Sequence, residues 1–182
     1  MKELSLNILD IAENSYKANA TLVEILINET DSVLSITIKD NGTGMTQDIL
    51  ASVTNPFYTT RKTRRVGLGI PLFKFAAEQT GGELRISSTH IDCDKDGHGT
   101  AVCATFFKNH IDFTPLGDII STVTTLIQGH PDTDLLFSHK SDKGEVVLDT
   151  GEIRSVLEDI PLDSYEILNW IRDNLAEQYN LI

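Results

Sequence analysis

LVEILINETDSVLSITIKDNGTGM, residues 22–45, is the stretch that decides the fold. Apolar and polar residues alternate over Leu22–Asn28 and again over Val33–Lys39, a period of two that predicts two strands joined by a polar hairpin turn. Asp40 ends the second strand, and Gly42 and Gly44 follow it. Glycines let a flat base approach such a loop closely, and the carboxylate can accept a hydrogen bond from an exocyclic amine. Taken alone, the motif fits an ordinary turn equally well.

The segment before this hairpin predicts a helix over residues 3–19. Asp10 and Asn14 are four residues apart and therefore share one face of that helix, with Lys17 three residues further on. An Asn carbonyl together with phosphate oxygens suits Mg²⁺, which keeps several waters and needs few protein ligands. An ordinary polar helix flank is the alternative interpretation of this trio.

The segment after the hairpin contains a cluster of basic residues, with four Lys and Arg within residues 61–65. A short helix is predicted over 46–53, an aperiodic basic loop over 55–66 and a helix over 68–80. Arg61-Lys62-Thr63-Arg64-Arg65 suits a ligand with several phosphates, because Lys and Arg donate charge-assisted hydrogen bonds to them. Val66-Gly67-Leu68-Gly69 opens the second helix, where free backbone N–H groups favour an anion. A solvated charge run and a structural turn are the alternatives.

Composition excludes several classes of partner. The chain has 182 residues, with 15 Lys and Arg against 27 Asp and Glu, a formal net charge of −12 that repels phosphate backbones and anionic lipids. No apolar run approaches the roughly 18 residues of a membrane-spanning helix. Two cysteines, Cys93 and Cys103, give no disulfide framework. We therefore expect a cytoplasmic protein without a nucleic-acid or membrane partner.

Strands over Glu83–Thr89 and Thr100–Phe107 close a first predicted domain at residues 1–109. Residues 110–182 are predicted to form a small α+β extension, partner-binding or regulatory, that packs on the first domain or on a partner. Its predicted elements are helices 116–128, 151–159 and 163–179 and strands near 134–138 and 145–148. Five residues suggest the apolar face of the last helix: Tyr165, Leu168, Trp170, Ile171 and Leu175.

The motifs, taken in order, resemble the GHKL superfamily, the Bergerat-fold ATPases and kinases of the DNA gyrase, heat-shock chaperone, histidine kinase and mismatch-repair families. The resemblance covers residues 4–107. Its boxes are Asp10–Ser15 (N box), Asp40–Met45 (G1), Asn55–Thr60 (F), Gly67–Gly69 (G2) and the closing Gly99-Thr100. It implies an α/β (α+β) two-layer sandwich that binds Mg·ATP, with a mixed sheet and helices on one face.

The resemblance also implies a role for each matching residue. Asn14 would ligate Mg²⁺, Lys17 would contact phosphate and Asp40 would bind the adenine amine. Thr100 would support adenine through water, and residues 55–66 would form a mobile ATP lid. The other implied nucleotide contacts are Gly42, Gly44, Met45, Phe57, Thr59, Thr60, Arg61, Lys62, Gly67, Leu68 and Gly69.

One departure from the family pattern leaves the reaction open. Four residues before the Mg²⁺ asparagine, the hydrolysing families and the anti-sigma serine kinases carry Glu, and histidine kinases usually carry Asn. This chain has Asp10, a possible but shorter base. Glu13, next to Asn14, is either an acid–base residue or simply surface.

Three functional hypotheses follow. The first is a histidine-kinase-like protein of bacterial signal transduction that transfers the γ-phosphate to a His or Ser of a partner. The second is an ATP-hydrolysing conformational switch with Asp10 as base, and the third is a non-enzymatic, anti-sigma-like ATP-sensing regulator. Each leaves the protein partner unidentified and a homodimer open.

The phosphate acceptor has one candidate in the sequence itself. Nine residues precede Asp10, so we expect no phospho-accepting helical hairpin ahead of the core. Asn109–Leu116 resembles a histidine-kinase H box and makes His110 the candidate acceptor, with a linker histidine as the alternative. Asp92–Gly97 begins like a calcium-binding loop, but Cys103 stands where the loop needs Glu, which favours an acidic hairpin.

Overall fold

The fold is a six-stranded sheet covered by helices. The computed structural model describes residues 3–54, 68–157 and 160–182. The strands are β1 (Leu22–Glu29), β2 (Val33–Asp40), β3 (Glu83–Thr89), β4 (Gly99–Phe107), β5 (Asp134–Ser141) and β6 (Gly144–Asp149). The helices are α1 (Leu4–Lys17), α2 (Gln47–Ser52), α3 (Gly69–Gln79), α4 (Ile119–Gly129), α5 (Thr150–Leu157) and α6 (Tyr165–Tyr179).

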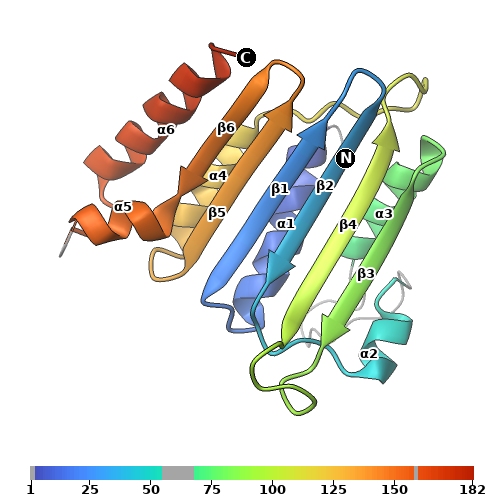
Figure 1. The fold of residues 1–182 in the computed structure, drawn as a ribbon. Helices are drawn as coiled ribbons and strands as arrows, with labels where there is room; N and C mark the ends of the chain where they lie inside the picture. The colour runs from blue at the N-terminus through green and yellow to red at the C-terminus, as the bar shows by residue number, and fades with distance from the viewer. Residues whose placement is uncertain (1–2, 55–67, 158–159) are drawn as a thin grey trace.

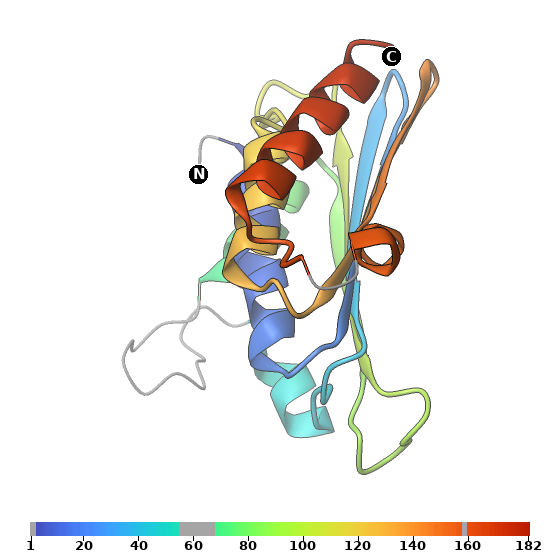
Figure 2. The same cartoon turned by 90° about the vertical axis from the view of Figure 1, so that its left-hand side faces the viewer.

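The strand order is β3-β4-β2-β1-β5-β6 (Figure 1). β1 and β2 form the predicted antiparallel hairpin, with Ile25 opposite Ile38. β5 runs parallel to β1, whereas each other neighbouring pair is antiparallel, so the sheet is mixed. Figure 2 shows α1, α3, α4 and α6 on the same side of the sheet. The predicted two-layer α+β sandwich is confirmed.

The core lies between that helical layer and the sheet. The buried face of α1 carries Leu4, Ile8, Ile11 and Ala12 at helical spacing. Every second residue of the central strands faces it, and these are Val23, Ile25, Ile27, Leu34, Ile36, Ile38, Val102, Ala104, Phe106, Leu135 and Phe137. β-branched and aromatic residues fit such a pleated, half-buried surface. The alternation that predicted the strands is therefore the burial pattern itself.

Residues 110–182 continue this same sheet. β5 pairs with β1 over its whole length, with Val23 opposite Leu135. α4 packs against α1 and α6, and α6 packs against β6. The division into two domains near residue 109 stays a prediction, but the two parts share one sheet and one core cluster.

The predicted apolar face of the last helix is partly wrong. Ile171 and Leu175 of α6 are fully buried, whereas Tyr165 and Trp170 are 76% and 52% exposed. Figure 1 shows α6 at the side of the molecule, beside β6. A helix at the margin of the layer buries only a narrow stripe, so the two aromatic rings that flank the stripe lie outside it.

A charged cluster joins the C-terminal strands to β1 at the end of the sheet opposite Asp40. Glu29 pairs with Lys108 at 2.6 Å and with Nε2 of His139 at 3.0 Å. Nδ1 of His139 lies 2.9 Å from the Tyr179 hydroxyl. Burial lowers the pKa of His139, although the Glu29 carboxylate favours its protonated form. Burial alone would raise the pKa of Glu29, but hydrogen bonds and positive charge from Lys108 and His139 outweigh it and lower that pKa.

The edge strand β6 is capped by a side chain. The amide of Gln178 accepts a hydrogen bond from the backbone N–H of Val147 at 2.8 Å and donates one to its carbonyl at 2.9 Å. Unpaired backbone N–H and C=O groups at the edge of a sheet can pair with a strand of another molecule. The Gln178 amide occupies both groups of Val147 in place of such a strand.

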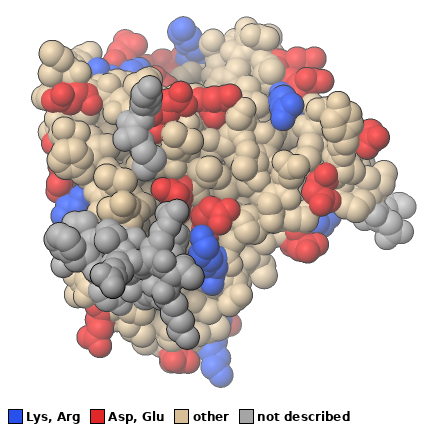
Figure 3. Space-filling view, turned by 180° about the vertical axis from the view of Figure 1, so that it is seen from behind, with Lys and Arg blue, Asp and Glu red and all other residues tan. Residues whose placement is uncertain are grey.

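The surface of the helical layer agrees with the acidic composition. Figure 3 shows Asp and Glu spread over that face, with Lys and Arg interspersed and covering less of it. Of the helices in the described part of the chain, none is both long and apolar enough to cross a membrane.

Candidate functional site

Asp40 stands at the end of β2 with its carboxylate held by three donors. Oδ1 accepts hydrogen bonds from the backbone N–H of Gly42 at 2.9 Å and of Thr100 at 3.2 Å. Oδ2 accepts one from the hydroxyl of Ser15 on α1 at 2.7 Å. The residue is only 9% exposed, so these bonds fix the orientation of the carboxylate before any ligand arrives.

The loop after Asp40 packs tightly against its neighbours. The Thr43 N–H donates to the carbonyl of Ala18 at 2.8 Å, and a side chain at Gly42 would meet that carbonyl at 2.7 Å. Gly44 has φ +69°, and a Cβ there would collide with the carbonyl of Thr89. The two glycines are therefore required by close approach and, at Gly44, by backbone conformation.

Three side chains form a row across the inner face of the sheet. Asp40 lies opposite Thr100, and Thr100 lies opposite Ser88. The Ser88 hydroxyl is 2.8 Å from that of Thr100 and 2.9 Å from the Gly99 carbonyl. It also accepts a hydrogen bond from the backbone N–H of Met45 at 2.7 Å. The row thus ties the loop after β2 to β3 and β4.

His98 adds a further link between that loop and β4. Its Nδ1 lies 2.6 Å from the Gly42 carbonyl, which can only accept, so Nδ1 carries the hydrogen. Gly99 has φ +135°, and a Cβ there would collide with the carbonyl of Asp40. The closing Gly-Thr motif therefore lets β4 approach the end of β2 closely.

Sequence reasoning named Asp40 and Thr100 but not their supporting residues Ser15, Ser88 and His98. Ser15 follows Asn14 directly, yet nothing in the helical pattern showed that it turns inward. The sequence indicated only that the strands containing Ser88 and Thr100 pair, because they flank one loop; the register that places the two residues opposite each other is seen in the structure.

In the helical layer, the start of α3 lies against α1. A Cβ at Gly69 would lie 3.5 Å from Cβ of Asp10 and 3.9 Å from Nδ2 of Asn14. Gly69 is the first residue of α3, and Leu68 before it is 48% exposed. The structure thus brings Asp10 and Asn14 of the predicted N box beside the first turn of α3, and the N-terminus of a helix favours an anion.

Glu13 and Lys17 belong to a separate ion-pair cluster on α1. Glu13 contacts Lys17 at 3.3 Å and His130, just after α4, at 2.9 Å. The His130 ring stacks on Tyr16 with 3.7 Å between ring centroids. Burial alone would raise the pKa of Glu13, but hydrogen bonds from His130 and Lys17 and their charges outweigh it and lower that pKa. Glu13 is therefore held as a carboxylate between two partners.

The structure does not bring His110 to Asp40 and Thr100. His110 follows β4 (Gly99–Phe107), in which Phe107 lies seven residues from Thr100, about 23 Å at 3.3 Å per residue. Its Nδ1 accepts a hydrogen bond from the N–H of Asp112 at 3.2 Å. The role of His110 as a phosphate acceptor stays a prediction.

Several predicted nucleotide contacts, from the lid and the G2 box, lie outside the described residues. These are Phe57, Thr59, Thr60, Arg61, Lys62 and Gly67. Their contacts with nucleotide stay predictions.

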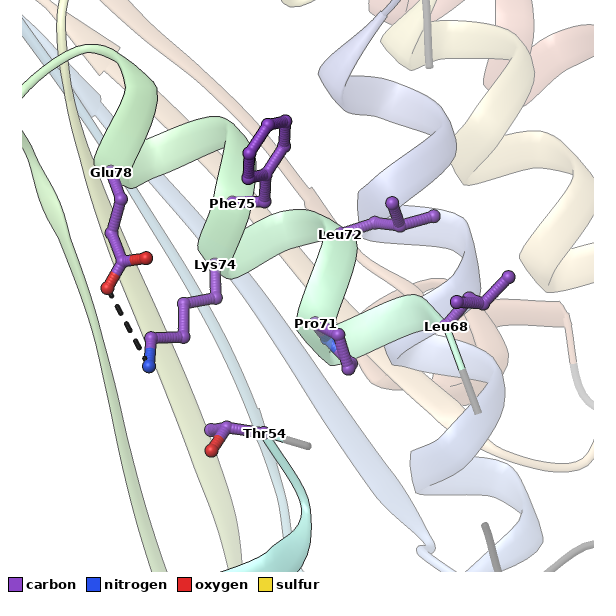
Figure 4. Close-up of a pocket in the computed structure, with 7 residues that line it drawn as sticks. All are labelled: Thr54, Leu68, Pro71, Leu72, Lys74, Phe75 and Glu78. Carbon is purple, nitrogen blue, oxygen red and sulfur yellow. Dashed lines mark ion pairs between the residues drawn. The ribbon is translucent and has the colours of Figure 1, made fainter. Parts of the chain in front are cut away.

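A pocket of about 330 Å³ opens on the outer side of α3. Thr54, Leu68, Pro71, Leu72, Lys74, Phe75 and Glu78 line it, and Figure 4 shows Lys74 turned toward Glu78, 3.6 Å away. Of the predicted site residues it includes Leu68, and neither Asp40 nor Thr100. The pocket therefore does not coincide with the row formed by Asp40, Thr100 and Ser88.

The acidic loop gives no sign of a calcium site. Within residues 3–54, 68–157 and 160–182, no cluster of three or more His, Cys, Asp or Glu side chains could hold a metal ion. Asp94 instead accepts hydrogen bonds from the backbone N–H groups of Asp96 and Gly97, which lower its pKa. The sequence alternative of an acidic hairpin fits this arrangement.

Comparison with known proteins supports the resemblance found in the sequence. A family model described as histidine kinase-, DNA gyrase B-, and HSP90-like ATPase matches residues 1–115. Sporulation kinase E of Bacillus subtilis (strain 168) is 37% identical over 101 residues, 55% of this chain and 13% of the kinase. Sporulation kinase C of the same strain is 34% identical over 90 residues, 48% of this chain and 20% of the kinase. The chain spans between 13% and 20% of the length of such curated relatives.

A solved structure shares the fold. The Aquifex aeolicus MutL ATPase domain complexed with ADP aligns with a TM-score of 0.54 at 15% identity, over 87% of this chain and 70% of that one. At this identity the likeness concerns the arrangement of helices and strands.

Proposed function

The chain belongs to the family of histidine kinase-, DNA gyrase B-, and HSP90-like ATPases, and from that premise we propose that it binds Mg·ATP between α1, α3 and the Asp40 end of the sheet and transfers the γ-phosphate to a partner protein. The acceptor would be a His or Ser of that partner, as in bacterial signal transduction. Hydrolysis of ATP with Asp10 as base is the second candidate, and ATP sensing without turnover is the third.

One observation carries the nucleotide assignment, namely the hydrogen-bond inventory of Asp40. A carboxylate has about four acceptor positions. The described residues fill two on Oδ1 and one on Oδ2, which leaves one position on Oδ2. A buried acceptor position of this kind suits the exocyclic amine of adenine, and the close packing at Gly42 and Gly44 suits a flat base.

The opposite wall supports phosphate binding. The start of α3 offers backbone N–H groups beside Asp10 and Asn14. Lys17, also on α1, pairs with Glu13 at 3.3 Å and would exchange that partner for phosphate. The Asn14 amide oxygen is a suitable Mg²⁺ ligand. When bound, Mg²⁺ would neutralise charge on the phosphate oxygens.

The transfer itself needs mainly alignment. The acceptor's imidazole nitrogen or hydroxyl oxygen forms a bond to the γ-phosphorus while the bond from that phosphorus to the bridging oxygen breaks, leaving ADP. Asp10 is exposed beside Gly69 and would take the proton of an attacking hydroxyl or water. Glu13 is less suited, because His130 and Lys17 already occupy its two oxygens.

Calorimetric titration of the full chain with Mg·ADP tests the binding step. Asp40→Asn should weaken binding by about a hundredfold, because a charge-assisted acceptor is lost. Asp31→Asn, in the exposed turn between β1 and β2 at the far end of the sheet, is the matched control and should leave affinity unchanged. Equal affinities of the two variants would contradict the site.

Incubation with γ-labelled Mg·ATP, with and without candidate partners, tests the reaction. Label on a partner supports phosphotransfer, and free phosphate that disappears in Asp10→Asn supports the hydrolysing switch. Nucleotide binding with neither product supports the sensing role.

A further inference from the structure

The three hydrogen-bond partners of the Ser88 hydroxyl restrict the direction in which its proton can point. One serine hydroxyl donates one hydrogen bond and accepts two. The backbone N–H of Met45, at 2.7 Å, takes one acceptor position. The Gly99 carbonyl, at 2.9 Å, can only accept, and the Thr100 hydroxyl, at 2.8 Å, can do either. Ser88 uses all three positions only when it donates to Gly99 and accepts from Thr100.

The state of Thr100 follows from this count. If Ser88 donated to Thr100 instead, the Gly99 carbonyl would lose this bond and Ser88 would keep an unused lone pair. The arrangement with three bonds is favoured over the one with two, because unmade hydrogen bonds of part-buried groups are costly. The Thr100 proton therefore points to Ser88, and Thr100 presents lone pairs toward Asp40.

We infer that Ser88 is a positioning residue that makes the site select a 6-aminopurine nucleotide over a 6-oxopurine, by holding the Thr100 hydroxyl as an acceptor. The inference rests on the proposed nucleotide site and deepens it. Asp40 and Thr100, opposite each other on neighbouring strands, then present acceptors side by side. The amino group of adenine donates to such a row, whereas the O6 lone pairs of hypoxanthine face other lone pairs and are repelled.

Two diphosphates that differ at position 6 give the measurement. The full chain and its variants are titrated calorimetrically with Mg·ADP and Mg·IDP, and the ratio of the two affinities is compared. Ser88→Ala frees the Thr100 proton to donate, so ADP affinity should fall while IDP affinity holds or rises. The ratio should drop by about tenfold, the worth of one hydrogen bond. Ser88→Thr keeps the hydroxyl and should keep the ratio within about twofold of the wild-type value.

The neighbouring serine is the matched control. Ser87 is exposed on the uncovered face of the sheet, opposite Ala101, so Ser87→Ala should leave both affinities unchanged. Ser88→Cys keeps the size and weakens every hydrogen bond, and it should lower the ratio in the same direction if the Ala variant does not fold.

The outcomes separate this inference from the proposed function. A Ser88→Ala variant that loses ADP and IDP affinity equally has only loosened the loop, and that result overturns the inference. So does an unchanged ratio. A wild-type chain that binds neither diphosphate overturns the proposed function and the inference with it.

Discussion

The two ends of the sheet both hold a part-buried carboxylate, but they use it differently. At one end, the described residues leave an acceptor position of Asp40 open. At the other, both oxygens of Glu29 have a partner, in Lys108 and His139, and Tyr179 meets the second nitrogen of His139. A paired cluster joins segments of the chain, whereas an open acceptor lets a ligand complete the site. We therefore expect changes at the first end to affect binding and changes at the second to affect stability.

Gly44→Ala should break the Asp40 end most severely. Its Cβ would collide with the Thr89 carbonyl, and the residue would need a positive φ that side chains rarely adopt. The loop must move, so we expect a loss of about a hundredfold or more in ADP affinity by calorimetry. In Gly129→Ala a Cβ would meet no atom within 4 Å, so that control should bind ADP normally. Normal binding by Gly44→Ala would mean that the loop does not shape the site.

Glu29→Ala should lower the stability of the fold and leave ADP affinity almost unchanged. It removes partners from Lys108 and from His139, whose side chain is only 6% exposed, so unfolding in denaturant should show a loss of about 2 kcal/mol. ADP affinity should stay within about twofold of wild type. Glu24, also on β1, pairs with Lys39, which is 56% exposed, so Glu24→Ala should cost less than about 1 kcal/mol. Equal losses from the two variants would argue against a special role for the Glu29 cluster.

The pH dependence of stability should show a smaller effect at the same end. Burial lowers the pKa of His139 in the folded state, with Glu29, Lys108 and the Tyr179 hydroxyl facing it. Between that lowered pKa and the unfolded value of about 6.5, the unfolded chain binds more protons. The stabilisation is complete above the unfolded pKa and is lost as pH falls toward the folded one. Unfolding titrations from pH 7.5 to 5.5 should therefore show a steeper decline in wild type than in His139→Gln; parallel declines would exclude His139 as the cause.

Much of the Asp40 end was predictable because its signals are local. The alternation of apolar and polar residues predicted β1 and β2, and the order of the sequence boxes singled out Asp40, Gly42, Gly44 and Thr100 as candidates. Glycine positions followed from the same motifs, since the backbone there must approach a ligand or another strand.

The rest depends on pairings that no local pattern encodes. Ser15, Ser88 and His98 act through contacts between segments far apart in the chain. The insertion of β5 beside β1 and the exposure of Trp170 on α6 are likewise set by tertiary packing. Alternation predicts that a strand exists but does not say which neighbour it takes.

The parallel pairing of β1 with β5 sets an order of events during synthesis. Val23 meets its partner Leu135 only after about 110 further residues have been made, and closing so long a loop is slow. Until then the hairpin of β1 and β2 presents an open, apolar strand edge to the surrounding solution. A nascent chain stalled before residue 134 would expose that edge, so chaperone contact is expected to concentrate on β1 and to end when β5 docks.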